Sequence, residues 1–257
     1  MTTENYIQAL KDYSKILTEY KSQYFIFNPT LKNDAVPKKK IIKSAEVCIS
    51  ESAECISAAD FMKKLNAKIA VCDKCKLSLK RNKTVCGRGS MRPLLMFIGK
   101  SPKHEEDSAG EAFVGKTKEV MDNIISKVLE IPLESVYFTN TVKCAAEGVN
   151  AADLNKCITA CSEYLYEEIE ILKPKFICAL GNEAMHILFK NQIHEKNTIT
   201  ELHGKSLNYK SIITIPTLNP GAFIYHPDPN KEKRRTVFED MKKLKQIMID
   251  LNFTGGN

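Results

Sequence analysis

Short apolar runs alternate with amphipathic segments along most of the chain, and this alternation limits the fold more than any other feature. The apolar runs have the length of buried strands and cover residues 94–98, 136–139, 176–180 and 212–215. Segments with apolar residues at helical spacing occupy residues 117–129, 152–172, 184–188 and 231–251. Strands that alternate with helices form a parallel sheet with helices on both faces. The sequence therefore predicts an α/β fold around a mostly parallel, four-stranded sheet.

The first predicted strand is followed by a polar loop that runs from Gly99 to Gly115 and contains Pro102 and Gly110. In open α/β sheets, ligands bind where such loops leave the carboxyl ends of the strands. A loop of this length at this place is more often functional than merely connecting. A binding site and an ordinary surface loop are the two interpretations, and position alone does not separate them.

The chain divides into an N-terminal extension, residues 1–57, and a main domain, residues 58–257. Apolar residues at helical spacing predict a helix at residues 4–21. Residues 28–57 have no clear period and read as a Lys-rich linker. The linker includes the basic run Lys38–Lys40. These lysines are either solvated or in contact with phosphate groups.

Another helix is predicted at residues 58–71, where Phe61, Leu65 and Ile69 fall on one face. This helix leads directly to Cys72. We therefore expect it to pack on the main domain and to deliver the cysteine.

The formal net charge of the 257 residues is +7 at pH 7. Such an excess suits a polyanionic partner such as nucleic acid, but a solvated Lys-rich surface would explain it equally well. No apolar run approaches the ~20 residues that span a bilayer. The first residues, MTTENYIQALKDY, lack the apolar core of a secretory signal. We therefore expect a cytoplasmic protein that does not act at a membrane.

The sequence contains nine cysteines, which in a reducing compartment indicate metal binding or simple burial rather than disulfides. Cys72 and Cys75 form a CxxC pair that can hold one metal, while distant cysteines complete a tetrahedral set. Cys144 and Cys161 are the candidates for completing it, and Cys157 competes for the fourth position. Spacing leaves zinc, an iron–sulfur cluster and unligated buried thiols as alternatives.

A series of ordered motifs resembles the family-4, iron–sulfur uracil-DNA glycosylases. The motifs run from residue 72 to about residue 244 and read CDKC, LLMFIG, EEDSAGEAFVG, VYFTNTVKC, ACSEYL, KPKFICALGNEA and IPTLNP. The resemblance implies a three-layer α/β/α sandwich and a [4Fe–4S] cluster, with zinc as the less favoured metal. The motif ACSEYL matches Cys161 rather than Cys157 to the family. The implied cluster ligands are Cys72, Cys75, Cys144 and Cys161.

The resemblance also implies an activity in DNA repair. A glycosylase of this family flips uracil out of DNA and hydrolyses its N-glycosidic bond. By resemblance, Phe113 stacks on uracil, Asn140 reads the edge of the base, and the backbone around Ser101 and Pro102 lines the pocket. We expect uracil-containing DNA, single- or double-stranded, as the partner, and a monomeric protein.

Two residues depart from the family pattern at the positions that carry its catalysis. The family loop usually reads GEAPG or GEGPG, and here Lys100 replaces its carboxylate, which positions water. A protonated lysine opposes the positive charge that develops on the sugar. Asn219 stands where the family has a histidine, and a neutral amide is a weaker donor to the uracil anion. His226 follows seven residues later and is interpreted as a loop residue.

The last predicted helix begins with a basic run, and we expect Lys233, Arg234 and Arg235 to contact DNA phosphates. Three hypotheses follow for the whole chain. It is a uracil-DNA glycosylase with altered catalysis, a glycosylase-fold protein that binds DNA without efficient cleavage, or a metal-stapled α/β protein for an unrelated ligand. Phe113 and Asn140 argue against the third, and the glycosylase is the leading hypothesis.

Overall fold

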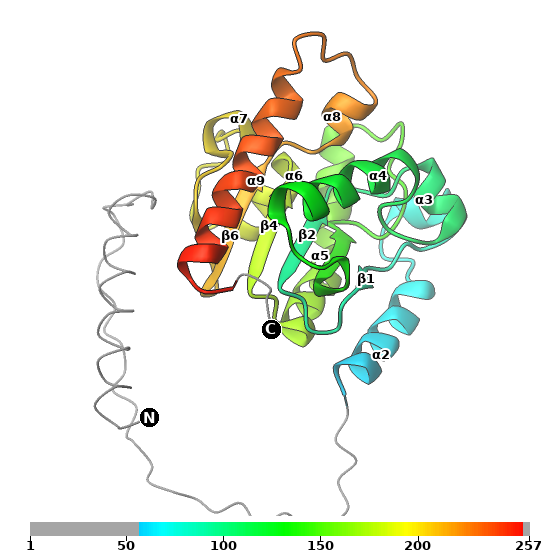
Figure 1. Cartoon of the computed structure of the whole chain (residues 1–257). Helices are drawn as coiled ribbons and strands as arrows, with labels where there is room; N and C mark the ends of the chain where they lie inside the picture. Colours follow the sequence, from blue (N-terminus) through cyan, green and yellow to red (C-terminus); the bar gives the residue numbers. More distant parts are fainter. Residues whose placement is uncertain (1–56, 254–257) are drawn as a thin grey trace, which may run out of the picture. The chain divides into compact units, whose positions relative to one another are not determined.

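The structure is a computed structural model, and it describes residues 57–253 (Figure 1). The predicted helix at residues 4–21 and the basic run Lys38–Lys40 lie outside the described residues. So do residues 1–56 of the predicted N-terminal extension.

Six strands form a single mixed sheet in the order β1-β3-β2-β4-β6-β5. The four central strands are parallel, and they are β3 (Val136–Asn140), β2 (Leu95–Gly99), β4 (Phe176–Leu180) and β6 (Ile212–Thr217). The edge strands are antiparallel, and they are β1 (Arg88–Gly89) and β5 (Leu207–Tyr209). The predicted count of four strands is therefore corrected to six. The edge strands are two and three residues long, too short for a hydrophobic period to reveal them.

Helices cover both faces of the sheet, as the alternation predicts (Figure 1). One face carries α2 (Ala58–Ala70), α5 (Ala151–Leu172) and α6 (Asn182–Phe189). The other carries α4 (Gly115–Ile124), its π-helical continuation η2 (Ile125–Leu129) and α9 (Glu232–Asp250). Successive strand side chains alternate between the two faces, and Met96 and Ile98 of β2 share one core cluster with α5. The three-layer α/β/α prediction is thus confirmed.

Helix α2 buries a stripe that differs by one residue from the predicted one. Leu65 and Ile69 are buried as expected, but Phe61 is 46% exposed and Met62 is buried in its place. At 3.6 residues per turn, Phe61 lies about 80° around the helix from Ile69, whereas Met62 lies only about 20° away. Helix geometry therefore favours the 62–65–69 spacing.

The predicted polar loop after β2 contains a short helix, α3 (His104–Ala109). Its first turn carries Glu105, Glu106 and Asp107, which interact favourably with the partial positive charge of a helix N-terminus. Gly110 ends the helix in the left-handed conformation, with φ of 79°. The helix was missed because two of its buried residues are the carboxylates Glu106 and Asp107 rather than apolar side chains.

The connection after β6 contains α8 (Gly221–Ile224) and leads to α9, while α7 (Ile199–Leu202), also four residues long, precedes β5. Between residues 57 and 253, no helix combines the length and the apolar character that crossing a bilayer requires.

Candidate active site and cysteine cluster

A polar cavity opens where β2, β3, β4 and β6 end, at their carboxyl edge. It holds about 1300 Å³ of empty space, including space open to solvent. Its lining includes Lys100, Ser101, Phe113, Asn140, Glu183 and Asn219. The cavity thus lies where parallel α/β sheets place their ligands, and it joins residues from four separate loops.

The base side of the cavity, as we call it, consists of Gly99, Phe113 and Asn140. A Cβ atom on Gly99 would lie 2.3 Å from Asn140 Oδ1 and 3.0 Å from Phe113 Cζ. Both distances are too short for ordinary contact, so only glycine lets the aromatic ring and the amide meet at the end of β2. The result is a planar apolar surface next to a hydrogen-bonding edge.

Asn140 is 3% exposed. Its Nδ2 forms no hydrogen bond of normal geometry with any residue between 57 and 253, although the amide lies close enough to Glu106 to lower the pKa of that carboxyl. An unsatisfied buried donor costs ~1–3 kcal/mol, so it needs a functional explanation. A primary amide both donates and accepts hydrogen bonds, which suits a ligand that presents a carbonyl next to an N–H group.

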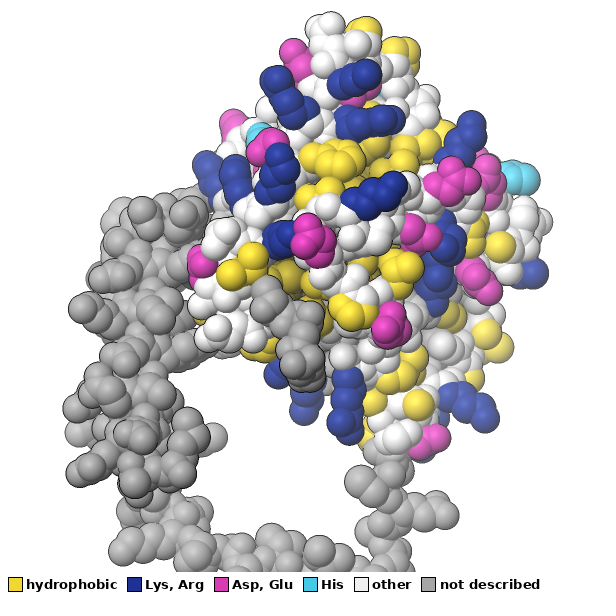
Figure 2. All heavy atoms as spheres, in the orientation of Figure 1, with side chains coloured by type: hydrophobic (Ala, Val, Ile, Leu, Met, Phe, Trp, Pro, Cys, Tyr) yellow, Lys and Arg dark blue, Asp and Glu magenta, His cyan; other side chains and the backbone are white. Residues whose placement is uncertain are grey.

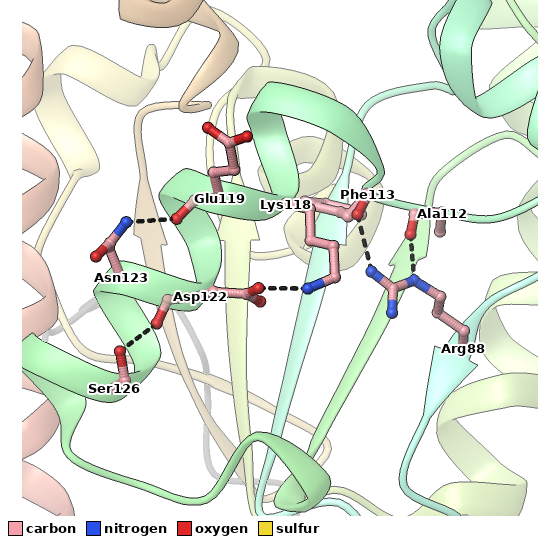
Figure 3. A network of polar contacts seen from close by, with 8 residues as sticks. All are labelled: Arg88, Ala112, Phe113, Lys118, Glu119, Asp122, Asn123 and Ser126. Atoms are coloured by element: carbon pink, nitrogen blue, oxygen red, sulfur yellow. Dashed lines mark hydrogen bonds and ion pairs between the residues drawn. The ribbon is translucent and has the colours of Figure 1, made fainter.

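The backbone of Phe113 is held from both sides in a left-handed conformation, with φ of 57°. Its N–H donates to Glu106 Oε1 at 2.5 Å. Its carbonyl accepts from Arg88 Nη2 at 2.8 Å (Figure 3). Arg88 Nε also donates to the carbonyl of Ala112 (Figure 3). A non-glycine residue in this region costs on the order of 1–3 kcal/mol, so these contacts fix the position of the ring.

Glu106 joins the base side to helix α3 from a buried position. It also accepts from the backbone N–H of Lys103, at 2.8 Å from Oε2. Burial raises the pKa of the Glu106 carboxyl, and the N–H groups of Phe113 and Lys103 partly oppose that rise. The phenyl ring of Phe138 supports Phe113 from behind, with the ring centroids 5.1 Å apart.

The reaction side, as we call the opposite part of the cavity, consists of Lys100, Glu183 and Asn219. Lys100 Nζ lies 2.7 Å from Glu183 Oε1, and their side chains are 44% and 25% exposed. Asn219 Oδ1 accepts a hydrogen bond from the N–H of Gly221 at 2.9 Å. A Cβ on Gly181 would lie 3.5 Å from Asn219 Cβ and 3.8 Å from Glu183 Oε2, so both side chains pass close to Gly181 at the start of α6.

The basic run at the start of α9 lies beside the reaction side. Lys233 Nζ lies 3.4 Å from the carbonyl of Ala222, which lines the cavity. The Arg234 guanidinium lies over the Phe223 ring at 5.3 Å, and Arg235 is exposed. Figure 2 shows Lys and Arg side chains over this face of the molecule, around the region where α8 and α9 meet.

Four cysteines line a separate hollow of about 300 Å³, including space open to solvent. They come from the segment after α2, the loop after β3 and helix α5, and they are Cys72, Cys75, Cys144 and Cys161. The alternative ligand Cys157 is buried but does not line the hollow. Within residues 57–253, no three His, Cys, Asp or Glu side chains are grouped so that they could hold a single metal ion.

Positive charge surrounds this hollow. Arg81 Nη1 lies 3.4 Å from Cys144 Sγ and opposes the rise that burial causes in the pKa of that thiol. Burial raises the pKa of Cys161 to about 11, and the Lys143 ammonium opposes that rise as well. Metals bind thiolates, and nearby cations favour the thiolate form.

A buried ion pair lies between the hollow and the base side. Lys143 Nζ lies 2.7 Å from Glu168 Oε2, and both side chains are almost fully buried. Lys143 also donates to the carbonyl of Asn140 at 3.0 Å, and Glu168 accepts from the hydroxyl of Thr139. The pair therefore anchors the end of β3, and Lys143 itself lies one residue before Cys144. Removal of one partner of such a pair typically costs ~3–5 kcal/mol.

Comparison with known protein families matches residues 86–242 to the model of the uracil DNA glycosylase superfamily. The chain belongs to this superfamily. Curated relatives named type-4 uracil-DNA glycosylase agree with the assignment. The protein of Sulfurisphaera tokodaii is 33% identical over 194 residues, which are 74% of this chain and 86% of the relative. The protein of Thermotoga maritima is 30% identical over 192 residues, which are 74% of this chain and 95% of the relative.

Within this superfamily fold, most of the predicted site residues come together. Phe113, Asn140 and Ser101 line the cavity with Lys100 and Asn219. Pro102 is buried and does not line it. His226, interpreted from sequence as a loop residue, follows α8 and also lines the cavity.

Four residues in or beside the cavity were missed from the sequence. Glu106 and Glu183 lie inside motifs that carry the resemblance, but nothing in their spacing connects them to Phe113 or Lys100. Arg88 precedes β2 in a segment without a recognisable pattern. Lys143 stands next to a candidate cysteine ligand, and nothing in the sequence indicates that it is buried in an ion pair. Each depends on a partner from a distant part of the chain, which only the fold brings close.

Proposed function

We propose that this protein excises uracil from DNA by hydrolysing the N-glycosidic bond, with catalysis altered on the reaction side. The observation that carries the proposal is the buried, unpaired Nδ2 of Asn140 beside the ring of Phe113. Membership of the superfamily and the names of its type-4 relatives support the same activity.

Uracil fits the base side because its edge complements a primary amide. Asn140 Nδ2 would donate to O4 of the base, and Oδ1 would accept from N3–H. Cytosine presents an amino group and an unprotonated ring nitrogen at these positions, so both hydrogen bonds would be lost. A site built around such bonds rejects the mismatched base strongly, because its own polar groups stay unpaired.

The cofactor of this proposal is a [4Fe–4S] cluster held by Cys72, Cys75, Cys144 and Cys161. The four thiols line one hollow, yet no three of the described ligand groups suit a single ion. Four thiolates hold zinc in some proteins and iron–sulfur clusters in others, and the resemblance of the motifs favours the cluster here. Its role in this chain would be to join α2, the loop after β3 and α5.

A second candidate function is a DNA-binding protein that flips bases and cleaves poorly. Lys100 and Asn219 favour it, since neither supplies the carboxylate or the imidazole that the resemblance leads us to expect. The basic residues Lys233, Arg234 and Arg235 would serve either function by binding phosphates.

A single-turnover assay on DNA with one uracil, in single- and double-stranded form, tests the proposed activity. We expect release of uracil, lost in Asn140→Ala and unaffected in Arg92→Ala, whose exposed side chain lies away from the cavity. If the wild type binds uracil DNA in preference to thymine DNA but releases no base, the second function holds. No preference for uracil in binding or cleavage rejects both.

Anaerobic purification tests the cofactor. We expect brown protein with iron and sulfide, and loss of both in Cys144→Ser and in Cys161→Ser. Cys157→Ser is the matched control on the same helix and should keep the cluster. Colourless protein with stoichiometric zinc would contradict the proposal.

A further inference from the structure

The ion pair of Lys100 with Glu183 offers the reaction side a carboxylate that the sequence motifs did not indicate. We propose that Glu183 is the catalytic carboxylate of the proposed reaction and that Lys100 is its positioning partner. This inference rests on the proposed function and deepens it.

Hydrolysis of the N-glycosidic bond needs negative charge near the sugar. The bond from C1′ to N1 breaks, its electron pair leaves on uracil, and positive charge develops on the sugar. A water oxygen then forms a bond to C1′, and the proton that this water loses passes to a carboxylate and on to solvent. The uracil anion takes up a proton from solvent. A carboxylate therefore positions the water and stabilises the cation at the same place.

Glu183 meets the geometric requirements for this role. It lines the cavity from the first turn of α6, and its Oε2 lies beside Gly181, as does the Asn219 side chain. Gly181 has φ of +92°, a conformation that favours glycine, so the turn from β4 into α6 sets this approach. A carboxylate has two oxygens, so Oε2 can accept a hydrogen bond from water while Oε1 is paired with Lys100.

The other carboxylates that line the cavity are less suited to the task. Glu106 is buried, and both its oxygens accept backbone N–H groups from Lys103 and Phe113. Glu147 is exposed on the loop after β3, which also borders a neighbouring groove. Glu183 alone among the described acidic lining residues lies on the reaction side.

The pairing also explains how a lysine is tolerated at position 100. An unpaired ammonium would repel the sugar cation, but the two charges of the pair sum to zero, so the reaction side carries no excess positive charge from them. Lys100 is half-exposed, so it holds Glu183 in position without burying its own charge. A change of Lys100 to Glu alone would place two carboxylates together, and their mutual repulsion would oppose ionisation of both.

Single-turnover excision by the cluster-loaded protein tests the assignment. We expect Glu183→Gln to lower the rate on the order of 100-fold, a typical loss for a group that positions a proton transfer. Its affinity for uracil DNA should stay within about two-fold, because the base side is untouched. Formate should restore part of the rate of Glu183→Ala, which a merely structural role would not allow. The matched control is Glu170→Gln, which removes an exposed ion pair with Lys210 on the far part of α5 and should change neither quantity.

A charge-swapped variant covers the case in which Glu183→Gln fails to fold. Lys100→Glu with Glu183→Lys keeps the pair and a carboxylate, so it should remain within about ten-fold of the wild type. Unchanged excision by Glu183→Gln, or a larger loss in Glu147→Gln, overturns the assignment and leaves the proposed function standing. Wild-type protein that releases no uracil overturns both.

Discussion

The two sides of the cavity differ in how firmly the fold holds them. On the base side, Asn140 and Phe113 are 3% and 4% exposed, and Phe113 is fixed by two hydrogen bonds to its own backbone. On the reaction side, the side chains of Lys100 and Glu183 are 44% and 25% exposed and fix mainly each other. The base side is thus part of the core, whereas the reaction side is part of the surface.

This difference explains which residues can change without loss of the fold. Base-side residues are closely packed, so substitution of one side chain by another of different shape disturbs the packing of its neighbours in the core. Charged residues near a surface can exchange positions if an ion pair remains, because solvent screens the rearrangement. The departures from the family pattern, Lys100 and Asn219, both lie on the reaction side.

A matched pair of glycine substitutions should show the difference between the two sides of the cavity most clearly. Gly99→Ala places a Cβ 2.3 Å from Asn140 Oδ1, and we expect uracil excision to fall at least ~100-fold, as for a misplacement of about 1 Å. Gly221→Ala meets Asn219 Oδ1 at 3.2 Å, and this half-buried amide can shift toward the open cavity, so we expect a change of a few-fold. Single-turnover rates of both variants test this, and equal losses would contradict the distinction.

A gain of function on the reaction side should follow from Asn219→His. An imidazole is a stronger donor to the uracil anion than an amide, and one such donor is worth ~2.7–4 kcal/mol when it is well placed. Because this side is open, we expect the new ring to be accommodated and the rate to rise by about 10- to 100-fold. The same measurement with Phe113→His provides the base-side control, which should lose activity. A slower Asn219→His protein would mean that Asn219 has its own role.

Arg88→Met should test whether the hydrogen bonds from Arg88 hold the backbone of Phe113 in position. The variant keeps the apolar stem but loses the hydrogen bonds to Ala112 and Phe113, so the ring should become mobile. We expect about ten-fold weaker affinity for uracil DNA, with little change in affinity for undamaged DNA. Binding titrations measure this, and the exposed Arg92 provides the control substitution Arg92→Met. Equal loss for both DNAs would make Arg88 a phosphate contact instead.

The smallest expected effect concerns the basic run at the start of α9, beside the reaction side. Each phosphate contact contributes about 0.9 to the slope of log affinity against log salt concentration. Lys233→Gln, Arg234→Gln and Arg235→Gln should each lower that slope by up to this amount without changing the preference for uracil. Lys242→Gln, further along α9 and paired with Glu239, serves as the control. A changed preference for uracil would place these residues inside the base side.

The sequence predicted those parts of the fold that repeat a local pattern. The four central strands are apolar runs, and the buried stripes of α5 and α9 have helical spacing, so both were found. The strands β1 and β5 and the helix α3 have short or polar sequences, and their stability comes from partners elsewhere. Asp107 of α3, for example, accepts hydrogen bonds from the backbone N–H groups of Asn82 and Lys83.

The candidate site divides in the same way. Phe113 and Asn140 belong to motifs that the chain shares with its family, and the cavity brings them together. The partner of Lys100 could not be predicted, because it depends on the turn at Gly181 that aims α6 at the end of β2. An ion pair between residues 83 positions apart leaves no periodic signal in a sequence.

The unpaired amide of Asn140 has a consequence for the end of the catalytic cycle. Cleavage changes only the N1 side of uracil, so O4 and N3–H still complement the amide after the base has left the sugar. The protein then gains nothing on its base side by releasing the base, since the buried donor would lose its partner again. We therefore expect the departure of free uracil to be slow, so that the freed base acts as a competitive inhibitor and turnover depends on its escape rather than on bond cleavage alone.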